Sequence, residues 1–438
     1  MEVNREPRAW SLDEKNRGLK GNDCNDCSND ILVEVEHGLP VFKKTLWSKL
    51  RMLSHLDLSH SNILVLPDAL GDLSGLRFLG ASHNKLRLLP SSVGQLKGLA
   101  KLVLTFNILS DLPPSFAELN NLEYLDVSNN QFKSPPECFQ MGCIKISHFD
   151  ISHNKIEEWS VGPMCAYGMK TFNCSYNCLK INPSWLWGDV CHSLEDLDLS
   201  FNSFSNLAHM IKTYTLWRTG VTVVLRNVNL NNCGLSTNDI HLLHQLKAVQ
   251  KLRLENGKVN GKLSLEAKSN FLWQISFKPF QSCASLTELY ISRVGLASLP
   301  EDISCLDSLE IFDCQGNYIQ WLPDTFSQLA NLRIAVLSNN KVLFLPQNFG
   351  NLISLEELRL DYNAMGELPS SFSNLKNLKW LDLYFNNFEE FPVCIGDVVM
   401  NLAGFDLDFN RLESSLLINK NVCICVFFKL LFKSCVCY

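Results

Sequence analysis

The sequence predicts an α/β solenoid, and two regularities lead to this fold class. An apolar residue opens a near-identical motif every 23 residues at Leu53, Leu76, Leu99 and Leu122, and the same spacing returns from Leu286 onward. Each copy reads apolar-x-x-apolar-x-apolar-x-x-Asn-x-apolar, often followed by x-x-Leu-Pro. A fixed period of this length indicates stacked supersecondary units, so function is expected on an extended surface and not in one cleft.

The copies divide the chain into segments. Fifteen are recognisable, beginning at Leu53, Leu76, Leu99, Leu122, Ile146, Met169, Leu194, Leu225, Val249, Leu286, Leu309, Leu332, Leu355, Leu378 and Leu402. The expected segments are a disordered N-terminal arm (1–29), a degenerate N-terminal capping repeat (30–52), a first regular arc (53–204), irregular repeats with an insertion (205–285), a second regular arc (286–415) and an apolar, Cys-rich C-terminal tail (416–438).

The opening residues of each copy are expected to form a short strand. Counted from the opening apolar residue, positions one, four and six face the core, while positions two, three and five face outward. The Leu-Pro step starts the convex half, because proline fixes φ and needs no hydrogen-bond donor. Strands pack more closely than convex segments, so the solenoid is predicted to curve into a horseshoe with a parallel concave β-sheet and convex short helices and loops.

An asparagine follows most strands at position nine, where the chain turns. Its side chain both donates and accepts, so it can satisfy backbone groups of neighbouring coils. We expect a structural ladder made of Asn84, Asn107, Asn130, Asn154, Asn177, Asn202, Asn317, Asn340, Asn363, Asn386 and Asn410. Four copies depart, with Ser61, Cys233, Gly257 and Val294 at this position, and the last two are expected to weaken the ladder locally.

Bulk composition favours the cytoplasm and argues against nucleic acid. The net charge is -6, and the Lys and Arg residues are scattered along the chain. The first ten residues contain no apolar stretch of the kind a secretory signal needs. The 17 Cys do not cluster at the ends of the repeats, and the one N-glycosylation sequon begins at Asn173, which favours reduced thiols.

Motifs for catalysis or metal binding are not expected. The sequence has no phosphate loop, no HExxH, no GxSxG and no dinucleotide fingerprint. Cys24 and Cys27 have zinc-like spacing, but no second pair lies nearby. A row of aspartates at position five follows the repeat consensus; its members are Asp57, Asp126, Asp150, Asp198, Asp382 and Asp406. We therefore expect no enzyme activity, no cofactor and no metal.

Two further segments allow more than one interpretation. Residues 341–344 match a basic-Val-x-Phe pattern that docks to protein phosphatase one, but Val342 occupies a core position, which favours a structural role. In the tail, Lys429 and Lys433 interrupt the apolar run, which argues against a spanning helix. The tail is interpreted as a C-terminal cap, as a gene-model or splice-derived segment, or as a membrane contact through acylated Cys, the only membrane contact expected.

The strongest positive signal is aromatic and lies on the second arc. Outward strand and rim positions carry a candidate partner-binding set: Arg359, Tyr362, Lys379, Trp380, Asp382, Tyr384, Phe385 and Phe409. Binding hot spots favour Trp, Tyr and Arg. A thinner set lies on the first arc: Arg77, Phe78, Lys101, Phe106 and Tyr124. The competing interpretation is that aromatic residues at position eight lean inward as packing.

The unit LxxLxLxxNxLxxLPxxFxxL resembles the intracellular leucine-rich repeats of the Ras group, which includes the suppressor-of-clear scaffold. Residues 53–136 and 286–392 match it best. The resemblance implies a leucine-rich-repeat horseshoe acting as a non-enzymatic scaffold or adaptor in intracellular signalling, with a protein partner such as a small GTPase or phosphatase on the concave face. Two departures are the lack of a phosphatase-docking sequence in the N-terminal arm and the irregular middle.

Two alternatives from other functional classes remain open on sequence grounds. The chain would be the recognition arc of a truncated leucine-rich-repeat phosphatase or kinase if a longer transcript carries a catalytic domain. It would be a membrane-proximal receptor fragment if the cysteines of the tail are acylated.

Overall fold

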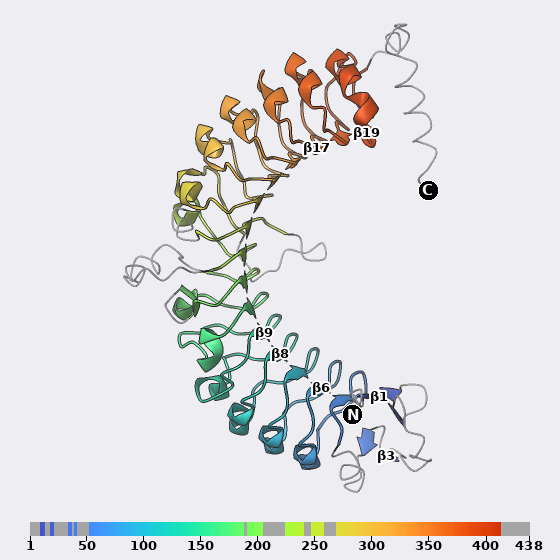
Figure 1. Ribbon diagram of the computed structural model, residues 1–438, viewed down its shortest axis with the longest axis vertical. Coiled ribbons are helices and arrows are strands. Elements are labelled where there is room, and N and C mark those ends of the chain that lie inside the picture. Colours follow the sequence, from blue (N-terminus) through green and yellow to red (C-terminus); the bar gives the residue numbers. More distant parts are fainter. Residues whose placement is uncertain are drawn as a thin grey trace, which may run out of the picture. The chain divides into compact units, whose positions relative to one another are not determined.

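The computed structural model describes residues 9–13, 18–21, 34–36, 39–41, 52–187, 191–204, 224–240, 247–257 and 269–412. The chain divides into two compact units, unit 1 over Met1–Leu225 and unit 2 over Arg226–Tyr438. Within each unit, short strands lie side by side along one face and short helical turns along the other (Figure 1). The predicted α/β solenoid is confirmed.

Unit 1 presents a run of parallel strands, one from each repeat. They are β5 (His55–Asp57), β6 (Phe78–Gly80), β7 (Lys101–Val103), β8 (Tyr124–Asp126), β9 (His148–Asp150), β10 (Thr171–Asn173) and β11 (Asp196–Asp198). Each pairs with the next at a shift of one repeat, so Leu56, Leu79 and Leu102 lie in register. The period of the sequence therefore fixes the register of the sheet.

Unit 2 repeats the arrangement. Its parallel strands are β12 (Asn227–Asn229), β13 (Lys251–Arg253), β14 (Glu288–Tyr290), β15 (Ile311–Asp313), β16 (Ile334–Val336), β17 (Glu357–Arg359), β18 (Trp380–Asp382) and β19 (Gly404–Asp406). The register again advances by one repeat, and Trp380 lies between Glu357 and Gly404 on the adjacent strands.

The opposite face of each unit carries only 3-10 helices in the part that the structure describes. In unit 1 they are η1 (Asp68–Asp72), η2 (Ser91–Gln95), η3 (Pro114–Glu118), η4 (Glu137–Gln140), η5 (Met164–Tyr167) and η6 (Ser184–Trp187). In unit 2 they are η10 (Lys278–Ser282), η11 (Glu301–Cys305), η12 (Asp324–Gln328), η13 (Phe349–Asn351), η14 (Ser370–Asn374), η15 (Val393–Asp397) and η16 (Val399–Asn401).

The Leu-Pro steps begin these turns, as predicted. Pro67, Pro90 and Pro369 are the N-cap residues of η1, η2 and η14, and each has an extended backbone with φ between -65° and -74°. Proline favours this φ and has no N–H to leave unsatisfied. A 3-10 turn rises more per residue than an α-helix, so a short period can still cross the outer face.

The core lies between the two faces and is filled from every repeat. Leu355, Leu358 and Leu360, at positions one, four and six, are fully buried. Phenylalanines from the outer turns add a second stack: Phe326, Phe349 and Phe372 follow one another at 6.2 and 6.4 Å between ring centroids, with nearly parallel rings. Because each coil packs on its neighbours, stability is distributed along each unit.

The asparagines at position nine connect successive coils. The side-chain oxygen of Asn84 accepts from the amides of Ser61 and Ile63 at 3.0 and 2.9 Å. Its side-chain nitrogen donates to the carbonyls of Leu58 and Ala81 at 2.8 and 3.1 Å. In the other asparagines of the expected ladder, the side-chain oxygen likewise accepts a backbone amide of the preceding coil. The side-chain nitrogen donates to a carbonyl that follows the strand of that same coil.

The ladder also continues where a glycine was expected to weaken it. Asn270, which is 1% exposed, accepts from the amides of Cys233 and Leu235 at 3.0 and 2.8 Å. Its side-chain nitrogen donates to a carbonyl of the preceding coil and to one of its own coil, both at 2.8 Å. The expectation for Gly257 is wrong, because an asparagine further along the chain supplies the missing amide. Residues 258–268 lie outside the described part.

The N-terminal region contributes four short strands. β1 (Ala9–Asp13) pairs antiparallel with β2 (Gly18–Gly21) and parallel with β5. β3 (Glu34–Glu36) and β4 (Leu39–Val41) form a separate antiparallel pair. The expected arm and capping repeat stay predictions, and the tail 416–438 lies outside the described residues. Within the described ranges, no helix combines the length and apolarity that crossing a membrane requires.

Candidate protein-binding surface

The residue before the ladder asparagine has a left-handed backbone in many coils. Tyr362, Phe385 and Phe409 have φ of 53°, 53° and 57°. This region is unfavourable for bulky L-residues, and each such residue costs about 1–3 kcal/mol. The turn places the three side chains at the end of the strand face, where they are 45%, 51% and 69% exposed. The competing interpretation required these three side chains to pack inward, and they do not.

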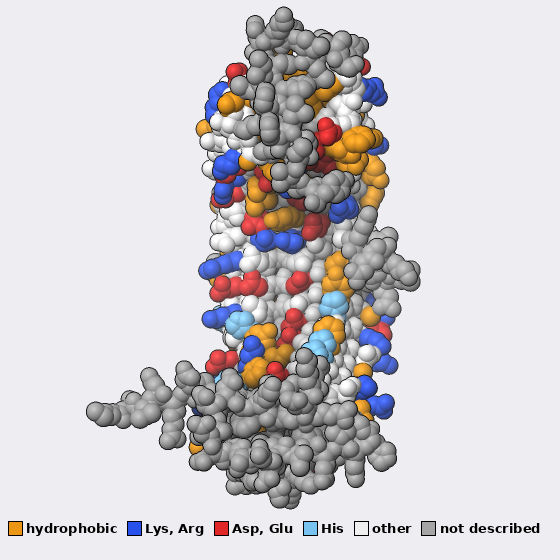
Figure 2. Space-filling model, turned by 90° about the vertical axis from the view of Figure 1, so that its right-hand side faces the viewer, with side chains coloured by type: hydrophobic (Ala, Val, Ile, Leu, Met, Phe, Trp, Pro, Cys, Tyr) orange, Lys and Arg blue, Asp and Glu red, His pale blue; other side chains and the backbone are white. Residues whose placement is uncertain are grey.

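These three rings and Tyr384 form a contiguous cluster, called the aromatic rim below. The ring centroids of Tyr362 and Phe385 are 5.1 Å apart, and those of Phe385 and Phe409 are 6.5 Å apart. Tyr384 contacts Tyr362 at 5.4 Å and Phe409 at 5.0 Å. Hydrophobic and acidic side chains lie next to one another on the strand face of unit 2 (Figure 2).

Trp380 lies at the opposite end of strand β18 from the aromatic rim. Its indole covers Gly404 on the next strand, where an added Cβ would lie only 2.2 Å from a ring carbon. The side chain remains 46% exposed. Residues of the candidate set therefore form two clusters, because among the described rings Trp380 has no aromatic contact with the rim.

The cations near the start of these strands are paired. Arg359 forms an ion pair with Glu357 at 2.6 Å, and Glu356 lies between Lys379 and Arg333 and pairs with both. Such exposed pairs contribute little to stability. They do neutralise this side of the surface, which surrounds Trp380 with balanced charge.

The aspartates at position five have a local structural role. The carboxylates of Asp126, Asp382 and Asp406 each accept the backbone amide two residues further on, at 2.9 to 3.0 Å. This bond ends the strand and shapes the turn, as Asx side chains commonly do. Burial raises the pKa of Asp382, and the nearby Asp361 and Asp406 raise it further, although the Tyr384 amide and Arg359 act in the opposite direction.

The thinner set on unit 1 also comes together in the structure. The Lys101 ammonium lies 4.4 Å from the ring centroid of Tyr124 and 5.9 Å from that of Phe78. Phe106 is not part of this group, because it stacks on His83 at 4.3 Å near the other end of the strands. Unit 1 therefore has a small cation–π cluster, which already contains its own cation.

The remaining sequence motifs concern peptide docking, metal binding and thiol reactivity. Val342 is fully buried, so residues 341–344 do not form a free extended segment. Cys24 and Cys27 lie outside the described residues. Within the described ranges, no group of His, Cys, Asp and Glu side chains is arranged to hold a metal ion. Burial raises the pKa of the Cys143, Cys165 and Cys191 thiols to about 12, which keeps them protonated and unreactive.

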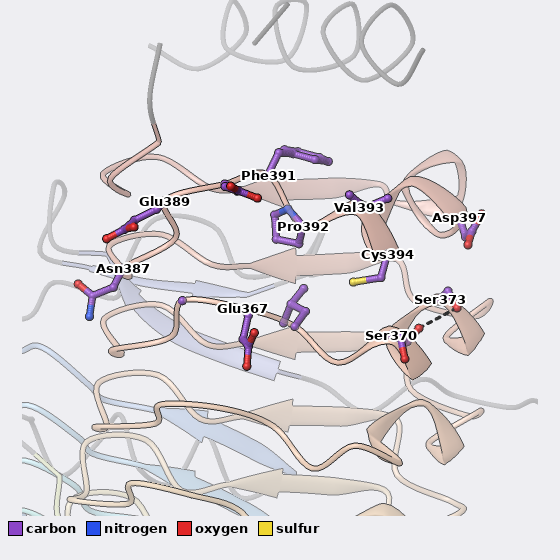
Figure 3. Close-up of a pocket in the computed structure, with 13 residues that line it drawn as sticks. Glu367, Ser370, Ser373, Asn387, Glu389, Phe391, Pro392, Val393, Cys394 and Asp397 are labelled. Carbon is purple, nitrogen blue, oxygen red and sulfur yellow. Dashed lines mark hydrogen bonds between the residues drawn. The ribbon is translucent and has the colours of Figure 1, made fainter. Parts of the chain in front are cut away.

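An open pocket of about 840 Å³ lies beside the last helical turns of unit 2. Figure 3 shows Glu367, Glu389, Pro392 and Cys394 among its lining residues. Burial raises the pKa of the Cys394 thiol, and no histidine lines the pocket. Its open shape differs from that of enclosed small-molecule sites.

Sequence reasoning missed an exposed aromatic group on the flank of unit 2. Tyr318, Trp321 and Phe344 are about half exposed, and Trp321 and Phe344 are joined by an isolated parallel bridge. Positions ten and thirteen of the repeat hold no consensus hydrophobe, so large aromatic residues there were a usable signal. Gly404 was also missed, since its value lies in the space it leaves for the Trp380 indole.

Family models for leucine-rich repeats match two parts of the chain: a leucine-rich repeat region at residues 263–391 and a leucine rich repeat at residues 97–156. A comparison with curated proteins finds no match. Several solved structures are similar. A leucine-rich-repeat protein of Leptospira interrogans is 25% identical with a TM-score of 0.66, and the match covers 86% of this chain and 83% of that one.

Two further similar structures have lower identity. The plant peptide hormone receptor RGFR1, solved with RGF2, is 22% identical with a TM-score of 0.57, covering 85% of this chain and 61% of the receptor. The functional domain of InlJ from Listeria monocytogenes is 18% identical with a TM-score of 0.57, covering 82% and 68%. The stacked repeats and these matches show a leucine-rich-repeat fold.

Proposed function

We propose that this protein is a non-enzymatic scaffold or adaptor that binds a protein partner on the strand face of unit 2. The observation that carries the proposal is the gathering of Trp380 and the aromatic rim, all partly exposed, on one rigid sheet. Large exposed aromatic residues beside charges are typical of binding hot spots. The sheet holds them in fixed positions, so little conformational entropy is lost when a partner binds.

Repeat architecture supports this kind of function. A solenoid offers a long surface whose residues vary while the core pattern stays constant. A plant receptor of similar fold was solved with RGF2, and the Toll structure, also similar in fold, with Spatzle. The resemblance to the Ras group suggests intracellular signalling, with a small GTPase or phosphatase as the partner class.

A cytoplasmic location is part of the same proposal. It is supported by the buried thiols of Cys138, Cys165, Cys174 and Cys314, which are unpaired and fill core positions. Buried unpaired cysteines of this kind suit a reducing compartment. Localising the tagged full-length chain by microscopy in intact cells tests this directly, and secretion into the medium would contradict it.

The binding proposal is tested by affinity capture with the full chain as bait. Wild type is compared with Trp380→Ala and with Trp321→Ala, the control. Trp321 is in the same unit with 49% exposure against 46% for Trp380, but it lies on the flank. We expect Trp380→Ala to lower the affinity for the captured partner by about thirtyfold, as loss of a hot spot does.

The outcome is read as a difference between variants, by quantitative mass spectrometry and then titration of the captured protein. Capture that falls with Trp380→Ala but not with Trp321→Ala supports the strand face. Equal capture by wild type and Trp380→Ala, with Tyr362→Ala and Phe409→Ala also silent, would contradict it and point to the cluster of Phe78 and Tyr124.

A further inference from the structure

The aromatic rim is more open than the equivalent stacks in unit 1. At the same repeat position, His153, Tyr176 and Phe201 stack with ring centroids 4.1 and 4.2 Å apart and with nearly parallel planes. In unit 2, Phe385 and Phe409 are 6.5 Å apart and inclined by 29°. In unit 1 these rings cover one another's faces by close stacking, whereas Phe409 is 69% exposed. The rim therefore offers free ring faces that a partner can contact.

Acidic residues adjoin the rings of the rim in the chain. Asp361 and Asp408 immediately precede Tyr362 and Phe409, and the amide of Phe385 donates to the backbone carbonyl of Asp408 at 2.9 Å. The carboxylate of Asp361 accepts from the Ser338 hydroxyl. Asp361 and Asp408 form no ion pair with any Lys or Arg in the part of the chain that the structure describes. Their charge is available to a partner.

The start of the same strands differs in charge from the rim. There, Arg359 and Lys379 are already paired with Glu357 and Glu356. The two ends of the same strands thus differ: one is balanced, and the other combines uncompensated carboxylates with exposed rings. Asp406 and Asp408 also raise the pKa of the Tyr384 hydroxyl, after desolvation and the adjacent Tyr362, so their field reaches the rings.

We infer that the aromatic rim receives an arginine side chain from an extended, cationic segment of the protein partner. A guanidinium is planar, so it stacks on a phenyl face, and its fork of donors matches a neighbouring carboxylate. Phe385 and Phe409 supply the faces, while Asp408 supplies the charge. A lysine ammonium fits less well, because it is a strongly hydrated point charge without a planar face. This inference rests on the proposed function and specifies the chemistry of the partner.

The probe is a fluorescein-labelled peptide of alternating glycine and arginine, titrated with the full-length chain and followed by fluorescence anisotropy. Matched peptides replace arginine with lysine or with citrulline, which keeps the planar shape but lacks the charge. At about 150 mM salt, where weak surface attraction is screened, we expect the arginine peptide to bind several-fold more tightly than the lysine peptide. We expect the citrulline peptide to show no measurable binding.

Variants separate a built site from general attraction to an acidic protein. Phe409→Ala leaves the net charge unchanged, and we expect it to weaken the arginine peptide by about tenfold. Phe106→Ala is the control, since Phe106 is 49% exposed at the same repeat position in unit 1; we expect no change. Melting by circular dichroism verifies that both variants are folded. Equal affinity of wild type and Phe409→Ala, or equal binding of arginine and citrulline peptides, would overturn the inference.

The two proposals fail in different ways. One outcome is that Trp380→Ala and Phe385→Ala lower partner capture while Phe409→Ala leaves the affinity for the arginine peptide unchanged. The strand face then binds a partner of other chemistry, and only this inference is lost. If partner capture is unchanged by Trp380→Ala, Tyr362→Ala and Phe409→Ala, the proposed function itself is contradicted, whatever affinity the peptide shows.

Discussion

Replacing Asn270 with alanine is expected to destabilise unit 2 strongly. The side chain is 1% exposed and makes four hydrogen bonds of 2.8 to 3.0 Å to backbone groups of two coils. Its removal leaves two amides and two carbonyls in the interior without these partners. At about 1 kcal/mol net per bond, the loss is about 4 kcal/mol.

The same change at Asn363 is the matched comparison. Asn363 also makes four such bonds, at 2.9 to 3.3 Å, but it is only half-buried, so water can replace part of what is lost. We expect Asn363→Ala to cost about 1–3 kcal/mol. Both variants keep the rest of the repeat unchanged, so their difference reports the effect of burial.

Urea unfolding followed by circular dichroism, with hydrogen exchange as a second probe, measures both costs. For a unit of this size, about 4 kcal/mol corresponds to a fall in melting temperature of about 8–16 °C. Hydrogen exchange should become faster at the amides of Cys233 and Leu235, which lose their acceptor. A loss at Asn270 no larger than that at Asn363, or unchanged exchange at those amides, would refute the role assigned to Asn270.

Three other outcomes are expected. Gly404→Ala should weaken partner binding about as much as Trp380→Ala, because the added Cβ displaces the Trp380 indole, and the melting temperature of Trp380→Ala should fall by only a degree or two. Titration measures the binding and thermal melting the stability, and unchanged binding by Gly404→Ala would contradict the position assigned to the indole. Burial raises the pKa of Asp126 in the folded protein above its unfolded value of 3.8. The protonated carboxyl therefore stabilises the fold below pH 3.8, and this stabilisation is lost as the pH rises through the folded pKa. Asp126→Asn should flatten the pH dependence of the melting temperature between about pH 4 and 7 and raise the melting temperature at neutral pH. Limited proteolysis should cut first within 256–285 once the N-terminal arm is trimmed, and uniform protection of that range in hydrogen exchange would count against it.

The repeating part of the fold was predictable from sequence because its causes are local. The alternation of apolar residues placed Leu355, Leu358 and Leu360 in the core, and the Leu-Pro steps marked where the outer turns begin. A period of 23 residues then leaves one way to pair the strands, with each residue beside its equivalent in the next coil. These features depend on spacing and backbone preference, both of which are written in the chain.

The candidate surface was only partly predictable. The sequence predicted that these side chains lie on the outward face of the sheet, since positions two, three and five of a strand must point away from the core. The sequence did not show that Trp380 lies apart from the aromatic rim. Contact between two side chains depends on their positions along the strands as well as on whether their coils are adjacent. It also left open whether aromatic residues at position eight point inward, which the left-handed backbone of Tyr362, Phe385 and Phe409 decides.

By itself, the sequence determined the solenoid class, the strand register and the identity of most ladder asparagines, because each follows from a short repeated pattern. Tertiary structure decided which asparagine completes the ladder after Gly257, since Asn270 reaches its place only after residues 258–268 have intervened. It also decided that Trp380 rests on Gly404 and that the rim stays open where the stacks of unit 1 are closed. These features depend on contacts between residues one or more coils apart, whose geometry no local pattern specifies.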